Sequence, residues 1–144
     1  MTIIIILILC GLVILSVAIH LSLLRCLIYL IRRMQSFPIL GMGISMFAAI
    51  SGHLFEIWIF SLAIMLMCSD VRFGSFAGDD QLTKGDYFYY SALSYTSLGF
   101  GDVSPEGALR TLSAVEAITG LVLIAWTASF AFLVMQELWG NKSR

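Results

Sequence analysis

The sequence predicts an all-α membrane protein with three transmembrane helices and a short re-entrant segment. Of its 144 residues, 60% are hydrophobic and only 12% are charged, whereas soluble proteins are about 45–50% apolar and about 25% charged. A soluble domain of this size leaves much of its surface in water and could not bury so much apolar surface. In addition, three hydrophobic runs are each long enough to cross a bilayer, which takes about 20 helical residues.

Composition also excludes several classes of function. The net charge is −1, from 8 Lys and Arg against 9 Asp and Glu, so no basic surface indicates nucleic-acid binding. Cys10, Cys26 and Cys68 are odd in number and widely spaced, which fits neither a disulfide framework nor a zinc site, and we interpret them as packing residues. The sequence shows no nucleophile–base pair and no metal-ligand spacing, so we do not expect an enzyme.

The first hydrophobic run covers residues 2–24 and contains no charge. A cleaved signal peptide is the alternative, but no Lys or Arg precedes the run, which exceeds the usual apolar region of about 7–15 residues. We therefore expect a retained peripheral helix. Residues 25–37, with three arginines, would be a cytoplasmic link, so that residues 1–37 form one unit and residues 38–144 the other.

The second and third runs frame the rest of the chain. Residues 38–68 form the second, beginning at Pro38, a residue suited to the first position of a helix. Residues 69–86 are rich in charges and glycine and predict a solvated external loop, and residues 108–138 form the third crossing.

A segment too short to span lies between the external loop and the third crossing. Residues 87–96 are rich in aromatic and hydroxyl side chains, and apolar segments of about 10–14 residues are more often buried or re-entrant than spanning. With three crossings, the termini fall on opposite sides of the membrane. The counts of Lys and Arg, five against three, place the N-terminus outside and the link and C-terminus in the cytoplasm (Arg25, Arg32, Arg33, Lys142 and Arg144 against Arg72, Lys84 and Arg110).

Residues 96–102, Thr-Ser-Leu-Gly-Phe-Gly-Asp, carry the main functional signal. Irregular backbone at membrane depth is tolerated only where it is buried in protein or lines a watery path. Gly99 and Gly101 alternate with Leu98 and Phe100, and glycine reaches positive φ at little cost, so successive carbonyl groups can point to one side. Four copies around an axis would make stacked rings of carbonyl oxygens that replace the hydration shell of a cation. The helix over 87–96 would point its partially negative C-terminal end at that path.

This string resembles the filter signature of potassium channels, T-x-V-G-Y-G-D, with Ser for Thr, Leu for Val and Phe for Tyr. The aromatic pair Tyr89-Tyr90 stands where that family has residues that brace the filter. Pro105 follows Asp102 as in the family's G-D-x-x-P continuation, and Gly120 stands where many members have a glycine hinge in the pore-lining helix. The resemblance covers residues 40–138. Within the family, the chain is similar to small bacterial two-helix-pore channels with one extra N-terminal helix.

The resemblance implies a tetramer around a central pore, with an outer helix 38–68, a pore helix 87–96, a filter 97–102 and an inner helix 108–138. Potassium would be the permeant ion, and no cofactor is expected. The ion would bind the carbonyl oxygens of Ser97, Leu98, Gly99 and Phe100. Gly101 would complete the filter, and Thr96 and Asp102 would support it. The protein would lie in the bacterial inner membrane. Its partners would be three further copies of the same chain, membrane lipid and an unidentified regulatory protein. Phe100 lacks the phenol hydroxyl of the commonest filter, so a weakly selective cation channel is the alternative. No helix carries Arg at every third position, so no voltage sensor of that type is expected.

Three ionisable residues lie inside the hydrophobic runs: His53, Glu56 and Glu116. Charged side chains in a bilayer usually face the protein interior with partners, and His53 and Glu56 share one helix face. We expect them to form a polar network with Glu116 behind the pore helix, reaching hydroxyls such as that of Ser94, with neutral carboxyl groups. The plainer alternative is that each only hydrogen-bonds a nearby hydroxyl or backbone group.

Two other classes of protein are rivals. A haem protein could use His20 and His53 as axial ligands. With a link that starts at residue 25, however, His20 would lie about 8 Å deep and His53 about 22 Å deep, so one iron could not reach both. A non-conducting accessory membrane subunit is the other rival, and it would need no intact filter string.

Overall fold

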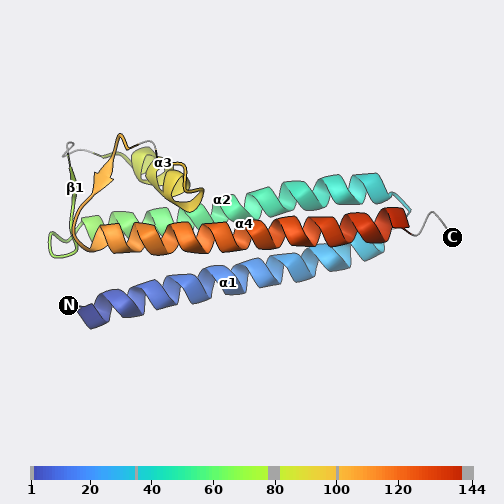
Figure 1. Cartoon of the computed structure of the whole chain (residues 1–144), viewed down its shortest axis with the longest axis horizontal. Helices are drawn as coiled ribbons and strands as arrows, with labels where there is room; N and C mark the ends of the chain where they lie inside the picture. Colours follow the sequence, from blue (N-terminus) through green and yellow to red (C-terminus); the bar gives the residue numbers. More distant parts are fainter. Residues whose placement is uncertain (1, 35, 78–81, 100, 141–144) are drawn as a thin grey trace.

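The computed structural model describes residues 2–34, 36–77, 82–99 and 101–140, and these form four helices and two short strands. The helices are α1 (Thr2–Arg33), α2 (Pro38–Cys68), α3 (Lys84–Tyr95) and α4 (Ala108–Gly140), and the strands are β1 (Phe76–Ala77) and β2 (Ser104–Pro105). The three long helices run side by side, and α3 lies at one end of the bundle, over α2 and α4 (Figure 1). The N-terminus is at that end and the C-terminus at the other (Figure 1).

The fold class predicted from the sequence is confirmed. In the described part of the chain, three helices are long and apolar enough to cross a membrane. The bounds of α2 match the predicted 38–68, and α4 begins at the predicted Ala108 and continues two residues beyond the predicted end at 138, to Gly140.

The predicted end of the first helix, at Leu24, is wrong. Helix α1 continues without a break through Arg25 and ends at Arg33, because Leu27 and Ile31 are buried against α2 and α4 and arginine is a good helix former. The connection to α2 therefore contains only residues 34–37. At 32 residues, α1 is about 48 Å long.

Helix α3 begins at Lys84, three residues before the predicted start at Tyr87, because a capping box forms at its N-terminus. The Asp86 backbone N–H donates to Thr83 Oγ1 (3.4 Å), and Asp86 Oδ2 accepts from the Thr83 backbone N–H (2.7 Å). These bonds satisfy two of the donors that a helix start leaves free. The Thr83 hydrogen bonds hold the pKa of the Asp86 carboxyl below its usual range.

The external loop folds back on the segment that follows the filter sequence. Strand β1 pairs antiparallel with β2, with Phe76 opposite Pro105 and Ala77 opposite Ser104. The Glu106 backbone N–H donates to the Ser75 carbonyl oxygen at 2.8 Å and extends the pairing. Phe76 is buried, so the loop predicted to be solvated also covers part of the core.

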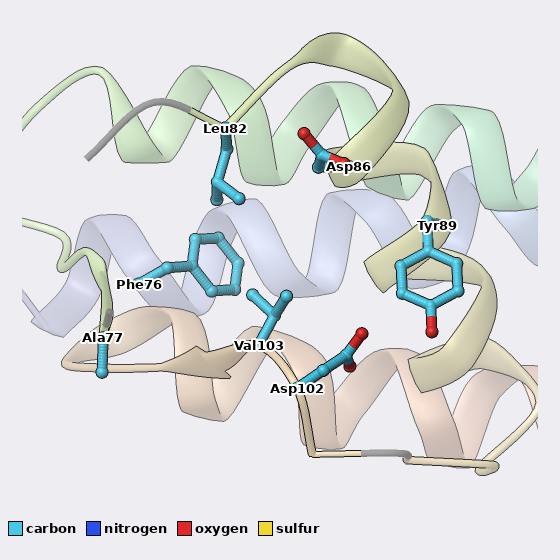
Figure 2. A pocket seen from close by; sticks show the side chains of 7 residues that line it. All are labelled: Phe76, Ala77, Leu82, Asp86, Tyr89, Asp102 and Val103. Atoms are coloured by element: carbon cyan, nitrogen blue, oxygen red, sulfur yellow. The ribbon is translucent and has the colours of Figure 1, made fainter. Parts of the chain in front are cut away.

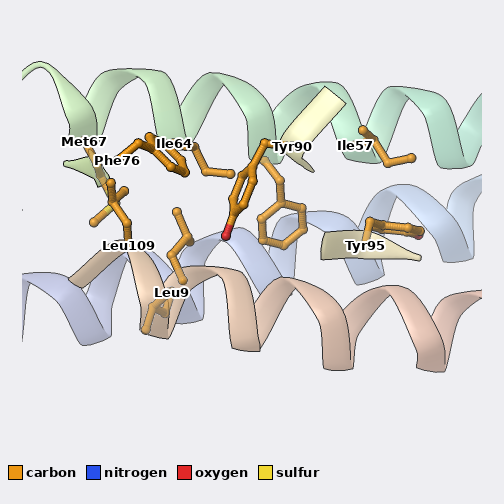
Figure 3. Close-up of a cluster of buried hydrophobic side chains, with 10 residues drawn as sticks. Leu9, Ile57, Ile64, Met67, Phe76, Tyr90, Tyr95 and Leu109 are labelled. Atoms are coloured by element: carbon orange, nitrogen blue, oxygen red, sulfur yellow. The ribbon is translucent and has the colours of Figure 1, made fainter. Parts of the chain in front are cut away.

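Two apolar clusters form the core. The larger lies at the α3 end and gathers residues from all four helices and β1 (Figure 3). The smaller lies toward the other end and contains Leu24, Leu27, Ile31, Ala49, Phe130 and Val134. On each long helix, a polar side chain lies in sequence between the residues of the two clusters: His20 on α1, His53 on α2 and Thr127 on α4.

Candidate functional site

The backbone between α3 and β2 alternates in conformation, as the glycine spacing predicts. Positive φ angles occur at Ser97 (59°), Gly99 (51°) and Gly101 (79°), while Leu98 between them does not have one. Phe100 lies outside the described residues. A non-glycine residue at such an angle costs of order 1–3 kcal/mol and persists where the surroundings impose it, often at a functional site.

Conformation rather than space requires glycine at positions 99 and 101. A Cβ built on either residue meets no atom of this chain within 4 Å. The side chains of this stretch are open in the single chain, with Leu98 61% exposed.

The end of α3 passes directly into this stretch through a tight turn. The Ser97 backbone N–H donates to the Ser94 carbonyl oxygen (2.9 Å), and the Leu98 N–H donates to that of Leu93 (3.0 Å). The Thr96 hydroxyl donates to the Ala92 carbonyl oxygen at 2.7 Å. The last turn of the helix therefore holds residues 97 and 98 through backbone hydrogen bonds, and the filter-supporting role of Thr96 stays a prediction.

The two tyrosines predicted to brace this stretch have different surroundings. Tyr89 and Asp102 both line a cavity of about 320 Å³ between α3, β1 and the segment that leads to β2 (Figure 2; Phe76, Ala77, Leu82, Asp86, Tyr89, Asp102 and Val103). Desolvation and the neighbouring Asp102 carboxylate raise the pKa of the Tyr89 phenol. Tyr90 instead donates to Ser113 Oγ at 2.7 Å and packs on Phe76 (Figure 3). Tyr89 alone of the pair thus lies at the filter sequence in this chain, and Tyr90 ties α3 to α4.

Gly120 is a contact point between α4 and the end of α3. A Cβ built on it would overlap the Tyr95 carbonyl oxygen and lie 2.8 Å from Tyr95 Cγ and 2.9 Å from the carbonyl carbon. The missing side chain lets the two helices approach at the residue where α3 ends. The predicted hinge role of Gly120 stays a prediction, and this packing role is independent of it.

Glu116 is fully buried and contacts α3 through Ser91. Ser91 Oγ lies 2.5 Å from Glu116 Oε1 and 2.8 Å from the Ile57 carbonyl oxygen. Because a hydroxyl has one hydrogen, it can donate to only one of these two acceptors. Both contacts are hydrogen bonds if Glu116 is protonated and donates to Ser91, which donates to Ile57. This geometry agrees with the expected neutral carboxyl group.

The predicted network of three ionisable residues is divided into two groups. Glu116 bonds Ser91, not the Ser94 named from the sequence, whereas Glu56 and His53 lie in a second group with Tyr95 of α3. Tyr95 Oη donates to Glu56 Oε2 at 2.5 Å, and His53 Nδ1 lies 2.9 Å from Tyr95 Oη. The expectation that the His53/Glu56 pair reaches α3 hydroxyls is therefore correct for Tyr95.

The second group also contains two residues that the sequence did not indicate for it, His20 and Thr127. His20 Nδ1 lies 3.0 Å from Glu56 Oε1, and the two imidazole centroids are 5.1 Å apart. The inference that His20 and His53 lie at different depths is therefore wrong, because it rested on a first helix ending at Leu24. Since α1 continues to Arg33, His20 lies 13 residues before its end (33 − 20) and His53 15 residues after Pro38 (53 − 38).

Proximity of the histidines does not make this group a haem site. At 5.1 Å between ring centroids, no space remains for a porphyrin between them. The ligand-type atoms of His20, His53 and Glu56 lie within 4.8 Å of one another, but each of these side chains is hydrogen-bonded to another member of the group. The group therefore fits a hydrogen-bonded network.

Helix α3 ends in a stretch with positive φ at residues 97, 99 and 101 and lies between two apolar crossings, which is the arrangement expected for the pore segment of an ion channel. Comparison with protein families agrees, because a family model described as "Ion channel" matches residues 52–137, more than half of the chain. The chain belongs to this family of two-helix ion-channel pores, as its resemblance to potassium channels indicated. Comparisons with curated proteins and with solved structures gave no match.

Proposed function

We propose that the protein is a homotetrameric potassium channel that conducts ions passively through a backbone-carbonyl filter, and not an enzyme. The observation that carries the proposal is the alternation of positive φ at residues 97, 99 and 101, directly after α3. The carbonyl oxygens of Ser97, Leu98, Gly99 and Phe100, with the Ser97 hydroxyl, would replace the water around a potassium ion. Gly101 and Asp102 would form the outer end of the path.

The exposed filter sequence of the single chain supports the proposal of a tetramer. The stretch at 97–99 is exposed on one protomer, and unpaired carbonyl groups cannot face lipid without a cost of several kcal/mol each. Four copies around an axis would turn these groups toward a water-filled path. Mass measurement or crosslinking in mild detergent tests this, and a folded monomer would contradict it.

The orientation in the membrane is proposed from the arginine and lysine bias. The end of α1, with Arg32 and Arg33, would lie in the cytoplasm together with the C-terminus, and the loop that carries β1 would face outward. The bacterial inner membrane is the proposed location.

Flux into liposomes tests the function. Purified protein, reconstituted in vesicles with opposed potassium and sodium gradients, should pass potassium in preference to sodium. Gly99→Ala should abolish the flux while the protein remains in the membrane, because a Cβ opposes the φ of 51°. Equal flux of the two ions would establish the weakly selective alternative, absence of flux would favour an accessory subunit, and normal flux in Gly99→Ala would refute the filter assignment.

A further inference from the structure

Five side chains, drawn from all four helices, form a closed ring of hydrogen-bonding contacts. The order is Glu56, Tyr95, His53, Thr127, His20 and back to Glu56. The contacts are Tyr95 Oη–Glu56 Oε2 (2.5 Å), His53 Nδ1–Tyr95 Oη (2.9 Å), His53 Nε2–Thr127 Oγ1 (2.9 Å), Thr127 Oγ1–His20 Nε2 (3.2 Å) and His20 Nδ1–Glu56 Oε1 (3.0 Å). We call this set the polar ring.

The polar ring has a definite proton requirement, because each of its five contacts needs one hydrogen. Tyr95, Thr127 and two neutral imidazoles supply one hydrogen each, and a carboxylate supplies none. With four hydrogens, one of the five contacts has two acceptors facing each other, and the ring carries a net charge of −1. A fifth proton fills every contact and makes the ring neutral, and an imidazole holds it because imidazole is more basic than a carboxylate. A sixth would set two donors against each other.

Burial makes the fifth proton important. His20, Glu56 and Tyr95 have no exposed surface, whereas His53 and Thr127 are half-buried. At the three buried members, water therefore compensates neither an unpaired acceptor nor a charge. Along each long helix, the ring residues lie between the residues of the two apolar clusters.

The ring also joins the peripheral helix to the start of the filter. Tyr95 is the last residue of α3, two positions before Ser97, and its carbonyl group is in close contact with Gly120 of α4. A change at His20 can therefore reach the filter backbone through Glu56 and the Tyr95 side chain. No other residue of α1 in the described chain donates to or accepts from the ring.

We propose that His20 is a positioning residue for ion conduction, and that the polar ring with its fifth proton holds Tyr95, and through it the filter, in the conducting arrangement. This inference rests on the proposed channel function. Potassium flux should be maximal while the ring keeps the proton and should fall as rising pH removes it. Helix α1 then belongs to the conducting machinery rather than serving only as a lipid-facing support.

The groups that could produce such a pH dependence are few. The ring is faced by His20 from α1, by His53 and Glu56 from α2, and by Tyr95 from α3. On α4, the titratable group that acts on Tyr95 is Glu116. The chain contains two histidines, and both are ring members. Glu116 is therefore the main competing source, and the experiment must separate it from the ring.

Thr127→Val provides the sharpest test, because it keeps the shape of the side chain and removes the acceptor that the doubly protonated imidazole requires. Losing a hydrogen bond to a charged donor should move the release of the fifth proton to lower pH by about one unit. Potassium flux, measured in liposomes between pH 5 and 9, should fall at correspondingly lower pH. His20→Leu opens the ring and should reduce flux at every pH with no step in this range.

The matched control is Ser16→Ala. Ser16 lies one turn before His20 on the same buried face of α1, and within the described residues its hydroxyl has no hydrogen-bond partner. Its flux profile should match that of the parent. A Thr127→Val profile equal to the parent's, or a pH step that survives His20→Leu and disappears in Glu116→Gln, would overturn the proposal. Loss of the parent's pH step on chelation with EDTA would show a bound metal ion in place of the proton and would also overturn it.

A second measurement does not depend on flux, so it separates failure of this inference from failure of the channel function. The 15N signals of the two imidazoles, recorded in detergent, should change together at one midpoint, and that midpoint should be lower in Thr127→Val. Independent titration of the two histidines would overturn the ring even in a conducting protein. A shared midpoint in a protein without flux would support the ring and refute the channel.

Discussion

Gly120→Ala tests whether close packing between α4 and the end of α3 positions the filter. The new Cβ would overlap Tyr95 backbone atoms, which cannot turn away as the end of a long side chain can. Such overpacking costs about 1–3 kcal/mol. The same substitution within a helix also gains roughly 0.5–1 kcal/mol from the better helix propensity of alanine. The two terms oppose each other, so the overlap must be measured against a second glycine.

Gly43→Ala supplies that reference. Gly43 is also inside a long helix, α2, but a Cβ built there meets nothing within 4 Å. The helix-propensity gain is common to both variants, so the difference between their free energies of unfolding leaves the overlap alone, about 1–3 kcal/mol. Thermal unfolding in detergent gives this difference, and potassium flux gives its functional consequence. We expect Gly120→Ala to be the less stable variant and to lose flux, because the Tyr95 carbonyl group must move.

An equal stability change in the two glycine variants would refute this reasoning. If Gly120→Ala were as stable as Gly43→Ala and only altered opening and closing, a hinge at Gly120 would explain the result, and the contact with Tyr95 would not limit packing.

Three further predictions concern α3 and its supports. Thr83→Ala should destabilise the protein by about 1 kcal/mol through loss of the N-cap, seen as a lower Tm; an unchanged Tm would contradict the capping role. The hydrogen bonds to Thr83 lower the pKa of the Asp86 carboxyl. The Asp86 carboxylate therefore stabilises the protein above its ordinary pKa of about 3.9, and this stabilisation is lost as the pH falls through its lower pKa in the folded protein. The Tm of Asp86→Asn should accordingly approach that of the parent only in acid. Glu116→Gln should keep both the fold and the Ser91 contact, because the amide donates as the neutral acid does. Glu116→Leu should lower the free energy of unfolding by about 0.5–1.5 kcal/mol through one lost hydrogen bond. A larger loss of stability in Glu116→Gln than in Glu116→Leu would show that Glu116 is ionised.

Much of the fold was predictable because its signals are local. Apolar length alone identifies a crossing, so α2 and the start of α4 were placed correctly. The glycine spacing in residues 97–101 predicted a backbone of alternating hand, because only glycine reaches positive φ without strain, and the structure confirms it at Gly99 and Gly101. The start of α3 was placed three residues late, because the capping box at Thr83 was not recognised in the sequence.

The composition of the site was decided by tertiary structure. Arginines at positions 25, 32 and 33 indicated the end of a crossing, but burial of Leu27 and Ile31 against neighbouring helices extends α1 to Arg33. That extension shifts His20 to the level of His53, and no pattern within α1 reports which residues of α2 lie opposite it. Hydrophobicity specifies that a helix crosses the membrane, whereas its axial alignment and the face that it presents depend on side chains of other helices. The ring therefore exists only once α1, α2, α3 and α4 have packed together.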